Sequence, residues 1–341
     1  MMADNLVPQE HGVNRSILQV RDLRVYYHTR DGAVKAANGV TFDLRVGERL
    51  GLVGESGSGK STIAMSLMRL IKPPGRIEGG QVILDGVSLL DLPEEKMRQM
   101  RLKEIALVAQ GAMNSLNPVM RVRPQIEYAL RDHDVKLSSS ELSNRVDQLL
   151  EMVGLRRNVA DFYPHELSGG MKQRVCIAIA ICLRPKVIIA DEPTSALDVV
   201  VQRQVMETLK TLGMALGASI VLIGHDMGLM AQAVDRLGVM YAGDLVETGS
   251  VEEIFANPLH PYTKLLIGSL PNLDRKEAAR GIPGLSPSLL NRPVRCPFQP
   301  RCPVAIDRCK TEEPILREAR PKREVACHLY VSESDRAREA L

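Results

Sequence analysis

Short apolar runs separated by turn residues dominate the beginning of the chain. Between residues 16 and 45, apolar side chains recur at about every second position, which is typical of half-buried β-strands. Residues 50–53 form a short apolar run that leads directly into a glycine-rich loop. After that loop the spacing changes to that of one helical face, at Ile63, Leu67 and Leu70. The pattern therefore predicts strands, then a strand–loop–helix unit.

The middle of the chain predicts helices and buried strands. Ser138 and Glu141 fit a capping box, and Gly154 is a suitable stop for the helix between them. Residues 187–190 and 219–223 are continuously apolar, as expected for strands of a mainly parallel sheet that is covered on both faces. The apolar face of the predicted helix consists of Leu142, Val146, Leu149, Leu150 and Val153.

Composition and charge narrow the class of protein. A length of 341 residues suggests two or three domains, and 45% hydrophobic with 25% charged residues excludes a disordered or fibrous chain. The net charge is only +3, and the chain has no Trp, seven Tyr and four Phe. Because nucleic-acid binding needs a basic surface or stacking aromatics, no nucleic-acid partner is expected.

No stretch of the sequence is long and apolar enough to span a membrane. The longest apolar run is residues 175–183, which is about half of what a membrane-spanning helix needs. Residues 1–15 read as a polar, flexible tail without the apolar segment of a signal peptide. We therefore expect a soluble chain that was not exported and that reaches a membrane only through a partner.

The composition changes near residue 255. From there to the end, the chain holds 11 of its 20 prolines, four of its six cysteines and 15 Lys and Arg against 10 Asp and Glu. Large apolar side chains are scarce in this part. A segment of this kind would struggle to build a core alone, so a metal or disulfide staple is expected.

A phosphate-binding loop is the clearest chemical signal. Residues 54–62, GESGSGKST, fit the pattern G-x-x-x-x-G-K-[ST] between a predicted strand and a predicted helix. Glycines let backbone N–H groups surround an anion, and the helix directs its positive end to the same place. Lys60 would reach the β- and γ-phosphates, and the Ser61 hydroxyl would ligate Mg²⁺. The residues expected to contact the nucleotide here are Gly54, Ser56, Gly57, Ser58, Gly59, Lys60, Ser61 and Thr62.

Two further elements complete the candidate site. The predicted strand at 187–190 ends in Asp191, placed to hold Mg²⁺ through water, and Glu192, placed to polarise the attacking water. The sequence LSGGMKQR places Ser168, Gly169 and Gly170 at the start of another helix, which is a second anion-binding end. One phosphate loop needs only one such end, so the second would act across a dimer.

These elements, in this order, resemble an ATP-binding-cassette (ABC) ATPase. We call LSGGMKQR at 167–174 the signature. The resemblance is narrowed to the ATP-binding subunits of dipeptide and oligopeptide importers by three further sequences: YPHE directly before the signature, GAMNSLNP at 111–118 and PLHPYT at 258–263. The resemblance implies an α/β P-loop NTPase fold with a RecA-like core, an antiparallel β subdomain, a helical subdomain at about 115–180 and a small, irregular, cysteine-rich C-terminal domain. The nucleotide-binding domain would cover 16–257 and the extension 258–341.

The resemblance also implies roles for four isolated residues. Tyr27 matches the aromatic that stacks on adenine, and Gln110 matches the glutamine that contacts Mg²⁺ and the attacking water. His225 matches the histidine that contacts the γ-phosphate, and Asp198 matches the loop that crosses the dimer interface.

The four late cysteines form a separate candidate site. Cys176 and Cys182 lie within the apolar run and read as small buried hydrophobic residues. A cytosolic setting disfavours disulfides, and four thiolates can hold one zinc ion or one 4Fe-4S cluster. The spacing matches neither usual pattern, and four unliganded thiols are a further reading; the resemblance to the importer extension implies a structural 4Fe-4S cluster. Its ligands would be Cys296, Cys302, Cys309 and Cys327.

The function implied by the resemblance is ATP hydrolysis that drives uptake of di- or oligopeptides. The implied partners are a paralogous ATPase subunit, two transmembrane permease subunits and an extracytoplasmic substrate-binding protein, with the chain peripheral to the cytoplasmic face of the inner membrane. Alternatives are the same role for nickel, oligosaccharides or opines, a soluble ABC ATPase outside transport, and an iron–sulfur redox sensor that regulates the ATPase.

Overall fold

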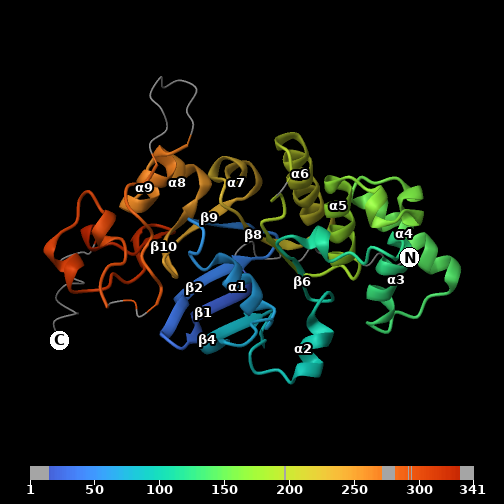
Figure 1. Ribbon diagram of the computed structural model, residues 1–341, viewed down its shortest axis with the longest axis horizontal. Helices are drawn as coiled ribbons and strands as arrows, with labels where there is room; N and C mark the ends of the chain where they lie inside the picture. The colour runs from blue at the N-terminus through green and yellow to red at the C-terminus, as the bar shows by residue number, and fades with distance from the viewer. Residues whose placement is uncertain (1–14, 196, 271–280, 291, 293, 331–341) are drawn as a thin grey trace, which may run out of the picture.

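The computed structural model describes residues 15–195, 197–270, 281–290, 292 and 294–330. The predicted flexible tail at 1–15 thus lies outside the described residues except for Arg15. The molecule is elongated, with the helices around α3 and α4 at one end, the late segment at the other, and the β-sheets between them (Figure 1).

Two β-sheets form the centre of the molecule. One sheet is antiparallel, in the order β2 (Gly32–Arg45), β1 (Ser16–Thr29), β4 (Gly75–Leu84) and β5 (Val87–Ser88). The other sheet has the order β11 (Arg317–Arg320), β12 (Arg323–Val325), β10 (Asp244–Ser250), β9 (Arg236–Tyr241), β3 (Arg49–Val53), β8 (Ser219–Ile223), β7 (Val187–Asp191) and β6 (Ile105–Val108).

The large sheet is parallel from β9 to β6 and antiparallel from β9 to β11. The helices are α1 (Lys60–Leu67), α2 (Glu94–Met100), α3 (Val122–Arg131), α4 (Ser139–Met152), α5 (Gly169–Ala180), α6 (Val199–Leu216), α7 (Met227–Ala233), α8 (Val251–Ala256) and α9 (Pro261–Gly268). Short 3₁₀ turns occur at Ala112–Asn114, Arg157–Asp161, Pro164–Glu166, Gln299–Arg301, Asp307–Lys310 and His328–Tyr330.

Strand periodicity divides the core into two layers. In β7, Val187 and Ile189 join a core shared with the antiparallel sheet and α1, whereas Ile188 and Ala190 join a core with the helices on the other face. All five residues of β7 and of β8 are buried. Because both faces are covered, these strands need continuous apolar runs, and the sequence prediction of buried strands at 187–190 and 219–223 is confirmed.

The predicted helix signals also appear in the structure, with one difference. Ser138 caps α4 in a capping box with Glu141, and Gly154 follows the helix in the left-handed conformation at φ 71°. The helix after the phosphate loop is shorter than the spacing predicted, because it ends at Leu67 and Leu70 lies beyond it against the core.

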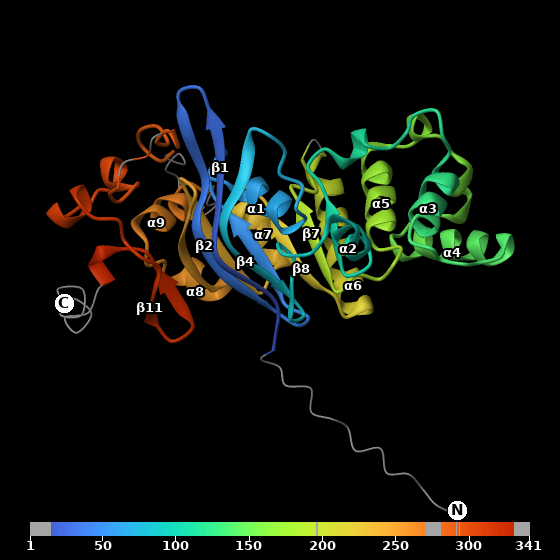
Figure 2. The ribbon, with the colours of Figure 1, turned by 90° about the horizontal axis from the view of Figure 1, so that it is seen from below.

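The late segment is built onto the large sheet. Strand β12 pairs with β10, and Phe298 and Tyr262 are buried in the same core as the helices. Figure 2 shows this segment beside α8 and α9 at one end of the sheets. This segment has few large apolar side chains, and it buries them in a core that it shares with its neighbour. Within the described ranges, no helix is long and apolar enough to cross a membrane.

Candidate active site

The glycine-rich loop lies between β3 and α1, as its sequence predicted. We call residues 54–62 the phosphate loop. Gly59 has φ 101°, and a Cβ there would lie 1.9 Å from the carbonyl oxygen of Ala36 on β2. Gly54 has φ 150°, and a Cβ there would lie 2.2 Å from the carbonyl oxygen of Met240. Only glycine fits both positions, because the neighbouring backbones approach so closely.

Lys60 is held inside this loop. Its Nζ donates hydrogen bonds to the carbonyl oxygens of Gly54 (2.9 Å) and Glu55 (2.8 Å) and to Ser58 Oγ (3.2 Å). Burial lowers the pKa of Lys60, although the nearby carboxylates of Glu192 and Asp191 act in the opposite direction. A buried ammonium group bonded only to neutral oxygens favours an incoming anion, because such an anion would replace part of its lost hydration.

Asp191 and Ser61 meet at the carboxyl end of β7. The Ser61 hydroxyl donates to Asp191 Oδ1 at 3.1 Å, although the two residues lie 130 positions apart in the chain. Asp191 is only 3% exposed, and burial raises its pKa. A hydroxyl and a carboxylate are hard oxygen donors of the kind that Mg²⁺ prefers, so the donor set fits this ion.

Glu192 lies beside this pair in a strained backbone conformation. Its φ is 43°, in the left-handed region that residues other than glycine rarely adopt, and such strain is often found at functional sites. Gln110 Nε2 donates to Glu192 Oε2 at 2.8 Å, and His225 Nδ1 lies 3.5 Å from Glu192 Oε1. Two residues predicted separately from the sequence, Gln110 and His225, thus lie against the carboxylate of Glu192. The arrangement can accept a proton at Glu192.

The signature residues contact a different part of the chain. Ser168 caps α5 by accepting a hydrogen bond from the Met171 N–H at 3.3 Å. Gly169 and Gly170 lie against Leu197 and Val201, and a Cβ on Gly170 would lie 2.4 Å from Val201 Cγ1. In both ribbon views, α5, which begins at Gly169, lies further along the molecule than α1 (Figures 1 and 2).

Asp198 and Tyr27 also lie in local contacts. Asp198 caps α6 by accepting a hydrogen bond from the Val201 N–H at 3.0 Å. The Tyr27 ring on β1 packs so closely on Gly75 that a Cβ there would lie 2.7 Å from a ring carbon. These contacts fix both side chains and leave the predicted dimer and adenine roles as predictions.

Two residues far along the chain contact the phosphate loop, and sequence analysis assigned neither of them a role. The Glu55 N–H donates to Tyr262 Oη at 2.9 Å, and Arg301 donates to both carboxylate oxygens of Glu55 at 2.8 and 2.9 Å. Tyr262 belongs to the PLHPYT motif, which the sequence marked only as a family feature. Separations of 207 and 246 residues leave no local signal for these contacts.

The four late cysteines are neighbours in space without forming a metal site. Burial raises the pKa of Cys296 to about 12 and that of Cys327 to about 11, and in both cases negative charge on other cysteines of the group adds to the shift. Thiols that influence each other in this way lie near one another. Among the described residues, which include all four cysteines, no group of three or more Cys, His, Asp or Glu could hold a metal ion.

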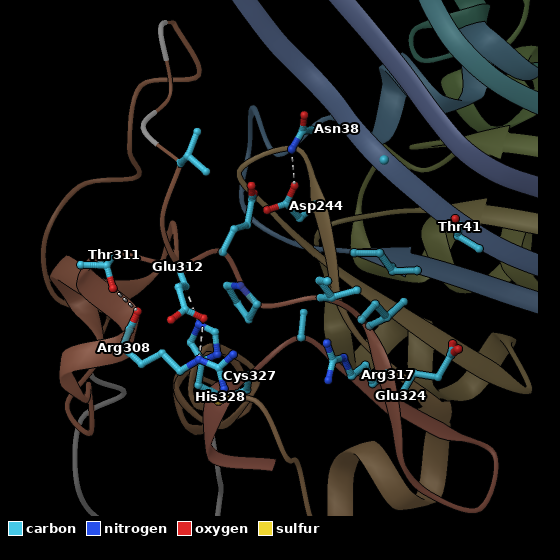
Figure 3. A pocket seen from close by; sticks show the side chains of 18 residues that line it. Asn38, Thr41, Asp244, Arg308, Thr311, Glu312, Arg317, Glu324, Cys327 and His328 are labelled. Atoms are coloured by element: carbon cyan, nitrogen blue, oxygen red, sulfur yellow. Dashed lines mark hydrogen bonds and ion pairs between the residues drawn. The ribbon is translucent and has the colours of Figure 1, made fainter. Parts of the chain in front are cut away.

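One of these thiols borders a broad cavity. Cys327 and the adjacent His328 lie on the wall of a space of about 1100 Å³ between the late segment and the sheets. Asn38 of β2 and Asp244 of β10, which are joined by a hydrogen bond of 3.4 Å, line another part of the same space (Figure 3).

Two known protein families match separate parts of the chain. A family described as ABC transporter matches residues 37–195, which include the phosphate loop, the signature and Asp191. A second family, described as oligopeptide/dipeptide transporter, C-terminal region, matches residues 246–309. The second match begins in β10 and includes three of the four late cysteines, Cys296, Cys302 and Cys309.

Curated relatives resemble nearly the whole chain. It is 45% identical to the dipeptide transport ATP-binding protein DppD of Caldanaerobacter subterraneus, over 92% of this chain and 97% of that protein. It is 44% identical to the oligopeptide transport ATP-binding protein OppD of Escherichia coli, over 93% and 94%.

Solved structures resemble the cassette part. The dimeric structure of the ATP-binding cassette MJ0796 in a post-hydrolysis state, bound to ADP and phosphate, matches with a TM-score of 0.62 and 27% identity. The match covers 69% of this chain and 98% of that one. The ABC-cassette P-loop fold and the antiparallel sheet predicted from the sequence are thereby confirmed.

Proposed function

Because this chain belongs to the ABC transporter family, in the group of dipeptide and oligopeptide transport ATP-binding proteins, we propose that it hydrolyses ATP to drive uptake of short peptides. The peptide cargo is supported by the names of relatives that match nine-tenths of the chain and by the match to the peptide-transporter C-terminal region. The ATPase activity is supported by the meeting of the phosphate loop with Asp191 and Glu192.

Binding of the triphosphate is assigned to the phosphate loop. The N–H groups at the start of α1, which has no side-chain cap, would bind the phosphate oxygens. Lys60 would exchange its carbonyl partners for the β- and γ-phosphates and neutralise their charge. When bound, Mg²⁺ would supply a Lewis acid, and Ser61, Asp191 and Gln110 are the residues that would hold it.

Hydrolysis is assigned to Glu192. Its carboxylate takes a proton from water, the water oxygen bonds to the γ-phosphorus, and the bond from that phosphorus to the bridging oxygen breaks to release ADP and phosphate. Gln110 fixes the carboxylate by its 2.8 Å hydrogen bond, and His225 would contact the γ-phosphate from the other side. The preorganised left-handed backbone at Glu192 supports this role.

A second cassette completes the site in this proposal. Ser168, Gly169 and Gly170 of a paralogous partner would face the γ-phosphate, and Asp198 would lie at the junction between the two subunits. The dimeric state named for the similar cassette MJ0796 supports this arrangement. The pair would act on two transmembrane permease subunits, supplied by an extracytoplasmic binding protein, from the cytoplasmic face of the inner membrane.

We also propose that the four late cysteines hold a 4Fe-4S cluster with a structural role. Support comes from the number of thiols, their proximity and the scarcity of large apolar side chains around them. The thiols as placed do not form a metal group, so their side chains would have to turn toward one another to become ligands.

The transport proposal is tested by replacing Lys60 in the intact transporter. Cells or proteoliposomes that carry Lys60→Ala should lose ATP-dependent uptake of a labelled dipeptide or tripeptide and retain the assembled complex. Nickel uptake, measured in parallel, separates the main alternative. Uptake of nickel but not of peptide by the wild-type transporter would overturn the peptide assignment, and peptide uptake by the Lys60→Ala transporter would overturn the ATPase assignment.

A further inference from the structure

The HPY sequence at 260–262 forms the start of α9 and fixes its position. His260 caps α9: its Nδ1 accepts a hydrogen bond from the Tyr262 N–H at 3.1 Å, and Pro261 occupies the first turn. The His260 N–H donates to Glu247 Oε2 at 2.9 Å. Burial lowers the pKa of His260 to about 3, so the ring is neutral and Nδ1 remains an acceptor at neutral pH. The start of α9 is therefore fixed against β10.

Tyr262 extends from this fixed helix end to the phosphate loop. Its side chain is fully buried, and its ring lies 4.6 Å from Tyr241 and 5.5 Å from Phe298, measured between ring centroids. The hydroxyl accepts a hydrogen bond of 2.9 Å from the Glu55 N–H. Aromatic packing leaves the ring little freedom, so the position of this amide is determined by α9.

Arg301 holds the same residue from the other side. Its two terminal nitrogens donate to the two carboxylate oxygens of Glu55, and its Nε donates to the Pro283 carbonyl oxygen at 2.8 Å. The Arg301 side chain is 6% exposed, and the guanidinium is the main cause of a lowered pKa at Glu55. Paired, parallel hydrogen bonds of this kind set orientation as well as distance. Arg301 directly precedes Cys302 in the chain.

The residue held in this way controls the environment of Lys60. The carbonyl oxygens of Gly54 and Glu55 accept hydrogen bonds from Lys60 Nζ. With the Glu55 amide bound to Tyr262 and the carboxylate bound to Arg301, the peptide groups that carry these oxygens are fixed before nucleotide arrives. A preorganised site loses less conformational entropy on binding.

We propose that Tyr262 and Arg301 are positioning residues for the phosphate loop. They hold the amide and the carboxylate of Glu55, contacts that we call the clasp, and thereby set the affinity of this chain for ATP. The inference rests on the proposed function, because it requires that the loop bind a nucleotide. It gives the C-terminal region found in peptide-transporter relatives a task in the nucleotide site. It also implies that a movement of the backbone at 296–302 would change the position of Glu55, because Arg301 directly precedes Cys302.

The test is the dissociation constant of Mg²⁺-ATP, measured by calorimetry on the purified chain with single replacements. Arg301→Met should raise this constant about ten-fold, and Tyr262→Phe, which keeps the ring packing, should raise it about three- to five-fold. Arg301→Lys should fall between wild type and Arg301→Met, because it keeps the charge but not the paired geometry. Lys310→Ala is the matched control: it removes a cation from an exposed ion pair with Asp307 in the same segment and should leave the constant unchanged.

A double-mutant cycle separates positioning from simple destabilisation. Glu55→Gln and Arg301→Met should each weaken ATP binding, and the double variant should be no weaker than the worse single variant. Thermal unfolding is recorded for each variant, because a merely structural role would lower the melting temperature without moving the dissociation constant. If wild type binds ATP and every folded variant, Tyr262→Phe included, binds it within two-fold, the clasp is disproved. If wild type itself fails to bind ATP, the proposed function falls, and the clasp falls with it.

Discussion

The carboxyl end of β7 at Asp191 and the cysteine segment, residues 296–327, differ in what fixes their side chains. At the end of β7, the strands β3 and β7 each pair with β8, and this pairing places Ser61, Asp191 and Glu192 close together. In the cysteine segment, the backbone around Cys296, Cys302 and Cys309 is held by turns and by ion pairs such as that of Arg301 with Glu55. Regular structure brings Ser61 and Asp191 into contact, whereas the late cysteines do not form a group that could hold a metal ion.

The two regions nevertheless support each other through contacts in both directions. The parallel strands have their own buried core, but Phe298 and Tyr262 lie in that same core and give the cysteine segment its apolar contacts. The clasp on Glu55 returns a contact from the segment to the phosphate loop. The comparison can be sharpened by changing each region separately.

The largest effect on activity is expected at the carboxyl end of β7. Glu192→Gln removes the proposed proton acceptor and should lower the rate of phosphate release at least about 100-fold while ATP binding stays within two-fold. Steady-state phosphate release and calorimetry measure the two quantities. Glu207→Gln, at an exposed position on α6, is the matched control and should keep the wild-type rate. Retention of more than half of the activity by Glu192→Gln would falsify the base assignment.

The next effect concerns the shared core. Phe298→Ala removes a fully buried ring that contacts Tyr241 and Tyr262 and should lower the free energy of unfolding by about 3 kcal/mol. Denaturant titration measures the loss, with the half-exposed Leu329, replaced by Ala, as a control expected to change little. A loss below about 1 kcal/mol for Phe298→Ala would show that the segment does not depend on this core.

The cysteine segment is tested by its iron content. Anaerobically purified wild type should contain about four iron atoms per chain and absorb in the visible range. Cys309→Ala should lose the iron, whereas Cys182→Ala, at a buried cysteine outside the group, should retain it. Wild type that holds stoichiometric zinc, or no metal at all, is the outcome that refutes the cluster.

The smallest effect is the pH dependence at the helix cap between pH 6.5 and 5. The folded state keeps His260 neutral, with its pKa lowered to about 3, whereas the unfolded state takes up a proton near pH 6.5. The stability contributed by the neutral ring is complete above pH 6.5 and is lost as the pH falls toward 3, by about 1.4 kcal/mol per unit. His260→Asn should reduce this slope in melting experiments between pH 6.5 and 5. An unchanged slope would show that the ring is not buried in its neutral form.

Sequence patterns sufficed where function follows from short, regular elements. Lys60 and Ser61 could be placed because a strand, a glycine loop and a helix lie within a few residues of each other, and Asp191 because it ends a buried strand. The contacts of Glu55 could not be foreseen, since Tyr262 and Arg301 lie more than 200 positions away and come from a short helix and a turn. The spacing of the cysteines did not predict how they are arranged in space, because Cys296, Cys302 and Cys309 lie among short turns and Cys327 follows a strand that pairs with β10. Ser168 and Tyr27 would act on a second chain or a ligand, and their intrachain contacts do not decide those roles.

Calorimetric titration of the purified chain with Mg²⁺-ATP tests the central claim, that the phosphate loop and the acidic residues at the end of β7 together bind a magnesium triphosphate. Wild type should bind one nucleotide per chain saturably, and both Lys60→Ala and Asp191→Asn should abolish or greatly weaken that binding. No heat on titrating wild type, or equal binding by all three proteins, would contradict the account.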